Sequence, residues 1–267
     1  MKQVHDLPAL RDTLAKELPF SIQALESVKH QIKFNFKPPK EIYVSEDPKS
    51  SFVVIKEVAF EAAPNFTVYC KEADINTAGF ELKDVIPWDQ PWSLGGVPGY
   101  LLPILQEQLH KRGLEDCLEL SDCWVFILEP HVTLPRMAIP PNYKIQHLAP
   151  NDVEFIDKMW KFRSDTSLPT LKAQANLGLA FGAIADGEVR SAFAAFSFGA
   201  VGALATSEAH RKMGLAQMVL AYGVQHLRSE DLIPFVFIEK YNKLSFDLFK
   251  KVGFTHTHNA FWLDWKC

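Results

Sequence analysis

The pattern of hydrophobic and polar positions is clearest in the second half of the chain. Residues 144–148 predict a short strand, and Asn151 or Asp152 can cap a helix that runs to about residue 162. Apolar residues in this helix recur at helical spacing and predict one buried face: Val153, Ile156, Met159 and Trp160. A second short helix is expected over about residues 165–176.

Three strands should follow these helices. Residues 178–185 and 188–198 flank Asp186-Gly187, which is typical of a type I′ hairpin because glycine readily adopts the positive φ that this turn requires. Residues 200–207 predict the third strand. The apolar run over 191–205 is shorter than the roughly 20 residues that span a bilayer, and Arg190 and Glu208 flank it. We therefore expect buried sheet here, and no membrane contact.

The pattern becomes helical from Gly214, and residues 233–239 then predict a central strand. Asn242 can cap a further helix over residues 243–252, and Gly253 stands where a C-cap glycine is common. Residues 254–265 alternate enough to form one or two strands. The predicted order is β-α-α-β-β-β-α-β-α-β, a mixed sheet with helices on both faces. The fold class is α/β, in the sense of an α+β mixed sheet.

The first half shows a weaker pattern. Strands are expected at residues 31–36, 40–46, 51–60 and 66–73 after an N-terminal helix, followed by a helix over 100–113 and a strand over 123–130. This last helix and strand resemble the pair that begins at Gly214 and ends at Glu239, which suggests a degenerate second copy of the same fold. Prolines 130, 135, 140 and 141 indicate a linker between the copies. We expect an N-terminal domain over 1–135 and a C-terminal domain over 143–267.

Composition narrows the class of protein. The 267 residues are 48% hydrophobic and carry a net charge of −4, so an ordinary globular protein is expected and a nucleic-acid partner is not. The spacing of the four cysteines (70, 117, 123 and 267) fits neither a zinc site nor a redox pair, so reduced thiols are expected. The N-terminus resembles neither a secretory signal nor a transit peptide. The cytoplasm is the expected compartment.

The residues that indicate chemistry lie between the third strand and the helix that follows it. The strand ends near Thr206, Arg211 follows in a turn, and Gly214 and Ala216 open the helix. The first N–H groups of a helix have no intrahelical acceptor, and the helix dipole adds positive potential at the same point. Small residues let an anion approach the main chain, and Arg211 adds a permanently charged donor. The segment predicts a pyrophosphate site.

This segment resembles the acyl-CoA pyrophosphate loop of the GNAT superfamily of N-acyltransferases, whose motif is Arg or Gln, two residues, Gly, one residue, then Gly or Ala. A second block, from Asn242 to Phe254, resembles the closing helix of that family and the glycine-aromatic pair after it. Within the superfamily, the glycine N-acyltransferase-like group is the most similar, because it also has an N-terminal half of this size.

The resemblance implies that acetyl-CoA or another acyl-CoA is the co-substrate and that a small amine is the acceptor, such as glycine or another amino acid. It assigns CoA binding to these residues: Thr206, Arg211, Lys212, Met213, Gly214, Leu215, Ala216, Asn242, Ser245 and Phe249. A backbone N–H near Thr206 would polarise the thioester carbonyl. The amine would attack that carbonyl directly, and CoA would leave as a thiolate. The mitochondrion is the alternative compartment that the resemblance allows.

The general base is open between three residues, ranked Glu208, Glu239 and His210. A solvated charge at a strand end is the alternative for each. Many members of the superfamily carry a tyrosine on the closing helix as general acid, where this chain has Phe249, which cannot donate a proton. A non-catalytic acyl-CoA-binding or scaffold protein is therefore the rival function.

Two other groups of residues could bind a ligand. His256 and His258 alternate along a predicted strand, but no third ligand is evident, so no metal is expected. Residues 87–99 combine two tryptophans with three glycines, and we expect a packed aromatic turn there in preference to a ligand site. The sequence does not indicate the oligomeric state.

Overall fold

The computed structural model describes residues 1–57 and 63–265. The chain divides into two compact units, each built from several segments. The first unit comprises residues 1–125, 237–241 and 257–267, and the second comprises residues 126–236 and 242–256. Residues 128–143 contain no helix or strand, as the prolines predict. The boundary between residues 135 and 143 stays a prediction, because segments from the C-terminal part belong to the first unit.

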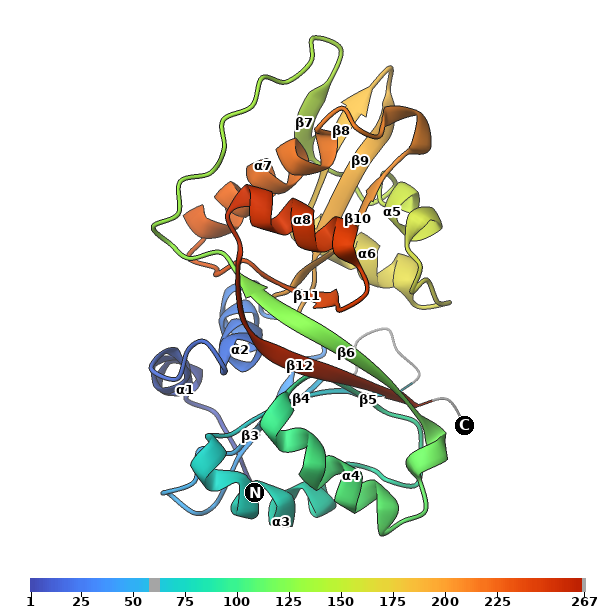
Figure 1. The fold of residues 1–267 in the computed structure, drawn as a ribbon. Coiled ribbons are helices and arrows are strands. Elements are labelled where there is room, and N and C mark those ends of the chain that lie inside the picture. Colours follow the sequence, from blue (N-terminus) through green and yellow to red (C-terminus); the bar gives the residue numbers. More distant parts are fainter. Residues whose placement is uncertain (58–62, 266–267) are drawn as a thin grey trace. The chain divides into compact units, whose positions relative to one another are not determined.

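The two halves of the chain repeat one order of elements (Figure 1). The first half contains β1 (Lys2–Gln3), α1 (Leu7–Ala15), α2 (Ile22–Phe34), β2 (Glu41–Val44), β3 (Val53–Glu57), β4 (Asn65–Tyr69), α3 (Ile75–Val85), β5 (Ser93–Pro98), α4 (Leu102–His110) and β6 (Leu118–Ile127). The second contains β7 (Lys144–His147), α5 (Glu154–Met159), α6 (Ser167–Asn176), β8 (Ala180–Ala185), β9 (Glu188–Ala195), β10 (Val201–Thr206), α7 (Leu215–Ser229), β11 (Phe235–Glu239), α8 (Lys243–Val252) and β12 (Thr255–Trp265). Short 3-10 turns lie at residues 72–74, 99–101, 115–117 and 208–210.

The repeat has the predicted order β-α-α-β-β-β-α-β-α-β in both halves. In one detail the prediction was wrong, because the order pairs α4 and β6 with α8 and β12, whereas α7 and β11 correspond to α3 and β5. The sequence pattern instead paired residues 100–113 and 123–130 with α7 and β11, which is one helix-strand pair too early in the second half.

Strands from both ends of the chain lie side by side. The order in the larger sheet is β1-β2-β3-β4-β5-β12-β6-β11, and the smaller sheet has the order β10-β9-β8-β7. The C-terminal strand β12 thus lies between β5 and β6, and it pairs antiparallel with β5. The segment over 191–205 forms parts of β9 and β10, so its assignment to buried sheet is confirmed.

The turns and caps of the second unit form where the sequence places them. Asp186 and Gly187 both have positive φ, 54° and 77°, as a type I′ hairpin requires. Asn242 accepts a hydrogen bond from the N–H of Ser245 at 3.1 Å and so caps α8. Gly253 ends α8 in the left-handed region, with φ of 110°.

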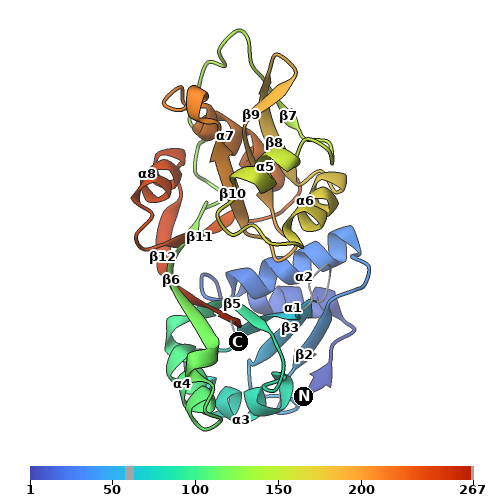
Figure 2. The same cartoon turned by 90° about the vertical axis from the view of Figure 1, so that its right-hand side faces the viewer.

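The small sheet of the second unit has a helix layer on each face (Figure 2). On one face, α5 and α6 pack against Ala180, Ala192 and Ala194. On the other face lies α7, where a methyl group added at Gly223 would meet the rings of Phe193 and Phe181 within 2.8 Å. Glycine at this position therefore lets α7 lie directly on the sheet.

The strand predicted over residues 31–36 was wrong, because α2 continues to Phe34. The alternating apolar residues Ile32, Phe34 and Phe36 resemble a strand, whereas the helix is set by the earlier series Ile22, Leu25 and Val28. Asn35, with φ of 46°, ends the helix. The strand predicted over 51–60 is β3, and residues 58–60 of that prediction lie outside the described residues.

The cysteines differ among themselves. Cys70 and Cys123 are free and buried, as expected. Cys117 is disulfide-bonded, so the expectation of a reduced thiol is wrong for this residue. Cys267 lies outside the described residues. Among the helices in the described parts of the chain, none is long and apolar enough to cross a membrane.

Candidate functional site

A β-bulge interrupts β10 just before the predicted site. The pairing of β10 with β9 shifts between Gly202 and Ala205, so that two residues on β10 face a single residue on β9. Ala203 in the bulge has φ of 51°, a left-handed conformation that costs an alanine about 1–2 kcal/mol. Such an outlier indicates a backbone shape that the rest of the fold enforces, and a bulge releases backbone groups from the ladder. Sequence reasoning missed this feature, because the positive φ falls on an alanine and not on a glycine.

Among the strands that the structure describes, β10 pairs only with β9 and forms the edge of the smaller sheet. Ala200 and Phe235 form an isolated parallel bridge, and from there β10 continues in the smaller sheet and β11 in the larger one. An edge strand presents a row of backbone N–H and C=O groups that its own sheet does not pair.

A short connection joins β10 to α7. Ser207 follows Thr206, a 3-10 turn covers Glu208–His210, and four residues then lead to the helix. Thr206 is held by its hydroxyl, which lies 2.8 Å from the hydroxyl of Ser191 on β9. His210 Nδ1 lies 2.8 Å from Ser207 Oγ, and the ring of Tyr143 packs edge-on against the His210 ring at 6.0 Å. The connection is thus fixed from within the second unit.

The start of α7 is open. We call the segment Arg211–Ala216 the phosphate loop. Lys212 and Gly214 both have left-handed φ, 63° and 77°, and no side chain of residues 1–57 or 63–265 caps the helix. The N–H groups of the first helical residues, Leu215 and Ala216, therefore have no acceptor within the helix. Leu215 is buried and anchors the turn, whereas Arg211, Lys212, Met213 and Gly214 are exposed.

This arrangement can bind a phosphate. Unpaired N–H groups and the positive end of the α7 dipole coincide with two exposed cations, Arg211 and Lys212. Arg211 Nε also lies 3.5 Å from the carbonyl oxygen of Thr206, so its side chain extends along the connection. A methyl group at Gly214 would meet only Met218 Cε, at 3.4 Å, which leaves the space over the main chain free.

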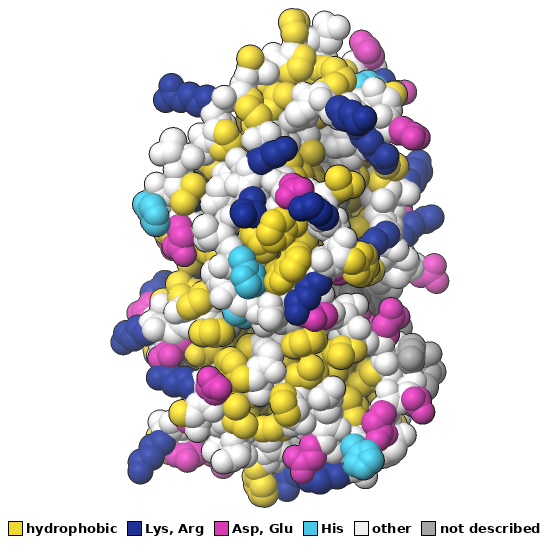
Figure 3. Space-filling model, in the orientation of Figure 1, with side chains coloured by type: hydrophobic (Ala, Val, Ile, Leu, Met, Phe, Trp, Pro, Cys, Tyr) yellow, Lys and Arg dark blue, Asp and Glu magenta, His cyan; other side chains and the backbone are white. Residues whose placement is uncertain are grey.

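Helix α8 packs against α7 and adds further positive charge. Lys243 and Lys250 lie over the Phe246 ring at 5.7 and 5.2 Å from its centroid. Figure 3 shows Lys and Arg side chains around a group of hydrophobic ones on the face where α8 lies in front.

Two of the three site residues predicted on α8 and at its cap have structural tasks. Asn242 uses its side-chain oxygen to cap the helix, and Phe249 is buried, with its ring packed edge-on against Phe254 at 5.0 Å. Ser245 is half-buried and donates its N–H to that cap. The structure brings Thr206 and the phosphate loop together in one connection, but it places Phe249 in the core.

The candidate bases differ in their surroundings. Glu208 is exposed in the 3-10 turn, directly between Thr206 and the phosphate loop. Glu239, in the first unit, ends β11 and accepts a hydrogen bond from the hydroxyl of Tyr241. His210 is engaged with Ser207. No group of three or more His, Cys, Asp or Glu side chains suited to a metal ion occurs within residues 1–57 and 63–265.

The corresponding connection in the first half lacks a phosphate loop. After β4, the 3-10 turn Glu72–Asp74 leads directly into α3 at Ile75, without the four residues that precede α7. Asp74 stands at the start of α3, where it accepts hydrogen bonds from the hydroxyl and the N–H of Ser51, the latter at 2.8 Å. These bonds hold the pKa of Asp74 below its ordinary value. A fixed negative charge at this helix start repels a phosphate.

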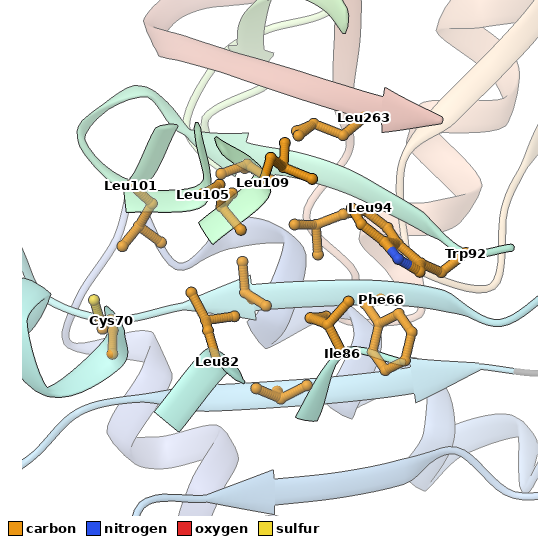
Figure 4. Close-up of a cluster of buried hydrophobic side chains, with 14 of the residues drawn as sticks. Phe66, Cys70, Leu82, Ile86, Trp92, Leu94, Leu101, Leu105, Leu109 and Leu263 are labelled. Atoms are coloured by element: carbon orange, nitrogen blue, oxygen red, sulfur yellow. The ribbon is translucent and has the colours of Figure 1, made fainter. Parts of the chain in front are cut away.

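The space between β4 and β5 is also filled. The described pairs between these parallel strands are Asn65–Ser93 and Phe66–Leu94, and in the second half Ala200, just before β10, forms a single parallel bridge with Phe235 of β11. Beyond that point the hydroxyl of Tyr100 donates to the carbonyl oxygen of Cys70 at 2.6 Å. Side chains of the first-unit core pack around them, including Leu82, Leu101 and Leu105 (Figure 4). The first half therefore keeps the layout of the fold, but the position that corresponds to the phosphate loop holds a fixed carboxylate and packed side chains.

The aromatic turn over residues 87–99 is also packed. A methyl group at Gly95 would meet the Trp262 ring at 2.6 Å, and one at Gly96 would meet Gln23 Oε1 at 1.8 Å. At Gly95 and Gly96, side chains of the same unit therefore occupy the space that a larger residue would need. Trp92 is fully buried, so the expectation of a packed turn is confirmed.

Comparisons with known proteins agree with this geometry. The model of the family described as FR47-like protein matches residues 176–263, which include the phosphate loop and α8. No curated protein matches the chain in sequence. A Drosophila protein of solved structure is 17% identical, with a TM-score of 0.84 over 99% of this chain and 98% of its own.

Two bacterial structures have a similar fold. A GCN5-related N-acetyltransferase-like protein from Streptococcus suis is 12% identical, with a TM-score of 0.56 over 97% of this chain and 100% of its own. A GCN5-related N-acetyltransferase from Kribbella flavida is 14% identical, with a TM-score of 0.57 over 92% of this chain and 96% of its own. The chain thus has the mixed α/β fold of the GCN5-related N-acetyltransferases, the GNAT fold that the sequence predicts.

Proposed function

We propose that this chain is an acyl-CoA-dependent N-acyltransferase that moves an acyl group from a CoA thioester to a small amine, such as glycine or another amino acid. The observation that carries the proposal is the phosphate loop, which joins open helix N–H groups to two exposed cations after a bulged strand. The resemblance to the glycine N-acyltransferase-like group supports the choice of acceptor.

The phosphate loop would bind the pyrophosphate of CoA. The N–H groups of Leu215 and Ala216 would donate to phosphate oxygens, and Arg211 would add a charged fork. The lysines of α8 would raise the local positive potential for the remaining phosphate. The residues present fit acetyl-CoA or another acyl-CoA, since the cradle combines backbone donors, net positive charge and free space over Gly214.

The reaction would take place beside the bulged end of β10, next to the phosphate loop. A backbone N–H released near Thr206 would donate to the thioester oxygen and stabilise the negative charge that develops on it. The amine nitrogen would form a bond to the carbonyl carbon, the carbon–sulfur bond would break, and the electron pair would leave on the CoA sulfur. Glu208 would accept the proton from the nitrogen, directly or through a water molecule.

The rival function is a non-catalytic acyl-CoA-binding protein. The phenylalanine at position 249 favours it, because α8 carries no tyrosine that could protonate the leaving sulfur. The phosphate loop would bind acyl-CoA in either case. Release of free thiol from acyl-CoA, measured with a panel of amines, separates the two: amine-dependent release supports the enzyme, and binding without release supports the rival.

Binding itself is tested by thermal unfolding. Acyl-CoA should raise the midpoint, because a ligand that binds only the folded state stabilises it by RT ln(1 + [L]/Kd). Arg211→Glu should remove most of this shift by placing a carboxylate against the pyrophosphate. Arg136→Glu makes the same change of charge at an exposed residue outside the site and should leave the shift intact. Equal shifts in both variants would remove the phosphate loop from the proposal.

The cytoplasm is the compartment that goes with this proposal, and the mitochondrion is the alternative. Cell fractionation distinguishes the two: the protein should be recovered in the cytosolic fraction, and recovery in the mitochondrial fraction would contradict this. Alkylation of free thiols in intact cells separately tests the disulfide at Cys117, since disulfides are rare in the cytosol: a reactive Cys117 would show that the bond is absent there.

A further inference from the structure

The loop between α5 and α6 holds an arginine on a buried carboxylate. Asp157 on α5 is 3% exposed and accepts hydrogen bonds from the Ser167 hydroxyl and from Arg163 Nε, the latter at 2.8 Å. The Ser167 hydroxyl also donates to the carbonyl oxygen of Ser164 at 2.9 Å. A buried charge is costly unless it is paired and hydrogen-bonded, so this arrangement fixes the position of Arg163.

Arg163 presents the rest of its guanidinium to solvent. Asp157 engages the Nε edge, and 62% of the Arg163 side chain is exposed. Arginine carries five donors in a planar fork and remains charged at all accessible pH values. A guanidinium whose orientation is already fixed loses less conformational entropy when it donates two hydrogen bonds to one carboxylate.

Arg163 belongs to the side of the small sheet opposite α7. The backbone N–H of Arg163 donates to the carbonyl oxygen of Trp160 at 3.2 Å, and the Trp160 ring stacks on the Phe196 ring with 5.5 Å between their centroids. The Phe196 ring covers Gly202, where an added methyl group would meet it at 2.8 Å. The loop of Arg163 is therefore packed, through Trp160 and Phe196, against the strand residue that begins the bulge.

This placement suits the second substrate. The phosphate loop opens at the start of α7, on one face of the small sheet, and the α5–α6 loop lies on the other face. Phe198 stacks on Phe196 at 5.5 Å and extends the aromatic wall beside the bulge. An acceptor that approached the thioester from this face would meet an apolar wall and a fixed cation.

We propose that Arg163, positioned by Asp157, binds a carboxylate of the acceptor, and that the substrate is an amine bearing such a group. This inference rests on the proposed function. Arg163 would then select amino acids over amines that lack a carboxylate.

The test compares glycine with glycinamide, which has the same amine arm without the carboxylate. Thiol release from acyl-CoA is measured for the wild type, Arg163→Gln and Lys161→Gln. Lys161 is the matched control, because it is a cation two residues away in the same loop, over the Phe162 ring at 4.4 Å. Arg163→Lys keeps a charge near Asp157 and serves if Arg163→Gln does not fold.

The wild type should prefer glycine, and Arg163→Gln should lower kcat/KM for glycine by about 10- to 100-fold, the usual effect of a lost charged hydrogen bond. Most of that loss should be in KM, and the value for glycinamide should change little. Arg163→Lys should fall between the two, and Lys161→Gln should resemble the wild type.

Equal losses for glycine and glycinamide in Arg163→Gln would mean that the residue only stabilises the loop, and would overturn the inference. Wild-type turnover that ignores the carboxylate would overturn it too, while leaving the proposed function intact. Absence of turnover with every amine would overturn the proposed function, and this inference with it.

Discussion

Gly214 and Gly187 form a natural pair for testing the phosphate loop. Both have φ of 77°, but Gly214 opens α7 and Gly187 stands in the β8–β9 hairpin. An alanine in this region costs about 1–2 kcal/mol, of which about 0.4–1 kcal/mol is recovered because the unfolded chain becomes stiffer. Neither methyl group would clash, since the nearest atom to the one at Gly214 is Met218 Cε at 3.4 Å and nothing lies within 4 Å of the one at Gly187.

The two alanine variants should therefore lose similar stability, about 1 kcal/mol, or roughly 2–4 °C in midpoint for a chain of this size. Their effects on acyl-CoA should differ. The methyl group at Gly214 would stand where the pyrophosphate approaches the main chain, and loss of one charged hydrogen bond weakens binding about 10- to 100-fold. Gly187→Ala should bind as the wild type does.

Isothermal titration calorimetry with acyl-CoA and urea unfolding of the same preparations measure both quantities. Unchanged affinity in Gly214→Ala, or an equal loss in both variants, would refute the assignment of the pyrophosphate to the α7 start. A loss of stability far above 1 kcal/mol in Gly214→Ala alone would show that the loop is set by contacts other than those described.

Three further predictions follow from the structure. Glu208→Gln should lower kcat by about 10²-fold or more while acyl-CoA still binds, and normal thiol release by this variant would transfer the role of base to Glu239 or to water. Calorimetry should give one acyl-CoA per chain, because Asp74 and Tyr100 occupy the corresponding site of the first half; a second site that survives Arg211→Glu would contradict this. Burial lowers the pKa of His30 to about 3, so the unfolded chain takes up a proton at this residue below its ordinary pKa of 6.5 and the folded chain does not. The free energy of unfolding should thus fall as the pH drops from 6.5 towards 3, by at most about 2 kcal/mol at pH 5. Urea unfolding at several pH values should show a weaker pH dependence in His30→Gln, whereas His110→Gln, at an exposed histidine, should behave as the wild type does.

The second half could be predicted from sequence almost element by element, because residues typical of turns and helix caps mark where its elements begin and end. Asp186-Gly187, Asn242 and Gly253 each permit a backbone conformation or a cap that few residues allow, and the structure uses all three. The loop from Arg211 to Ala216 was located on the same grounds.

Features set by distant contacts could not be predicted. The bulge at Ala203 depends on packing against the α5–α6 layer, and alanine gives no sign of positive φ. The burial of Phe249 depends on Phe254, which follows the helix and folds back on it. Asp157 and Arg163 were missed because a carboxylate and a cation six residues apart are common, and only the burial of Asp157 distinguishes this pair.

The first half was harder to interpret because its site residues differ while its elements correspond. Tyr100 and Tyr241 both lie two residues after the corresponding strands β5 and β11. The Tyr100 hydroxyl donates a hydrogen bond to the Cys70 carbonyl oxygen, whereas Tyr241 is exposed. The sequence indicated a repeat through one helix and strand that were paired one unit out of step, and the order of elements in the structure gives the correct correspondence.

Transfer of labelled acyl groups tests the central claim most directly. The purified protein is incubated with acyl-CoA labelled in the acyl carbonyl and with a mixture of small amines, and the products are identified by mass spectrometry. The proposed function predicts label in an amide of at least one amine, together with an equal amount of free CoA, and loss of both in Arg211→Glu. Acyl-CoA that binds to the wild type and is recovered intact, with no labelled amide from any amine, would contradict it.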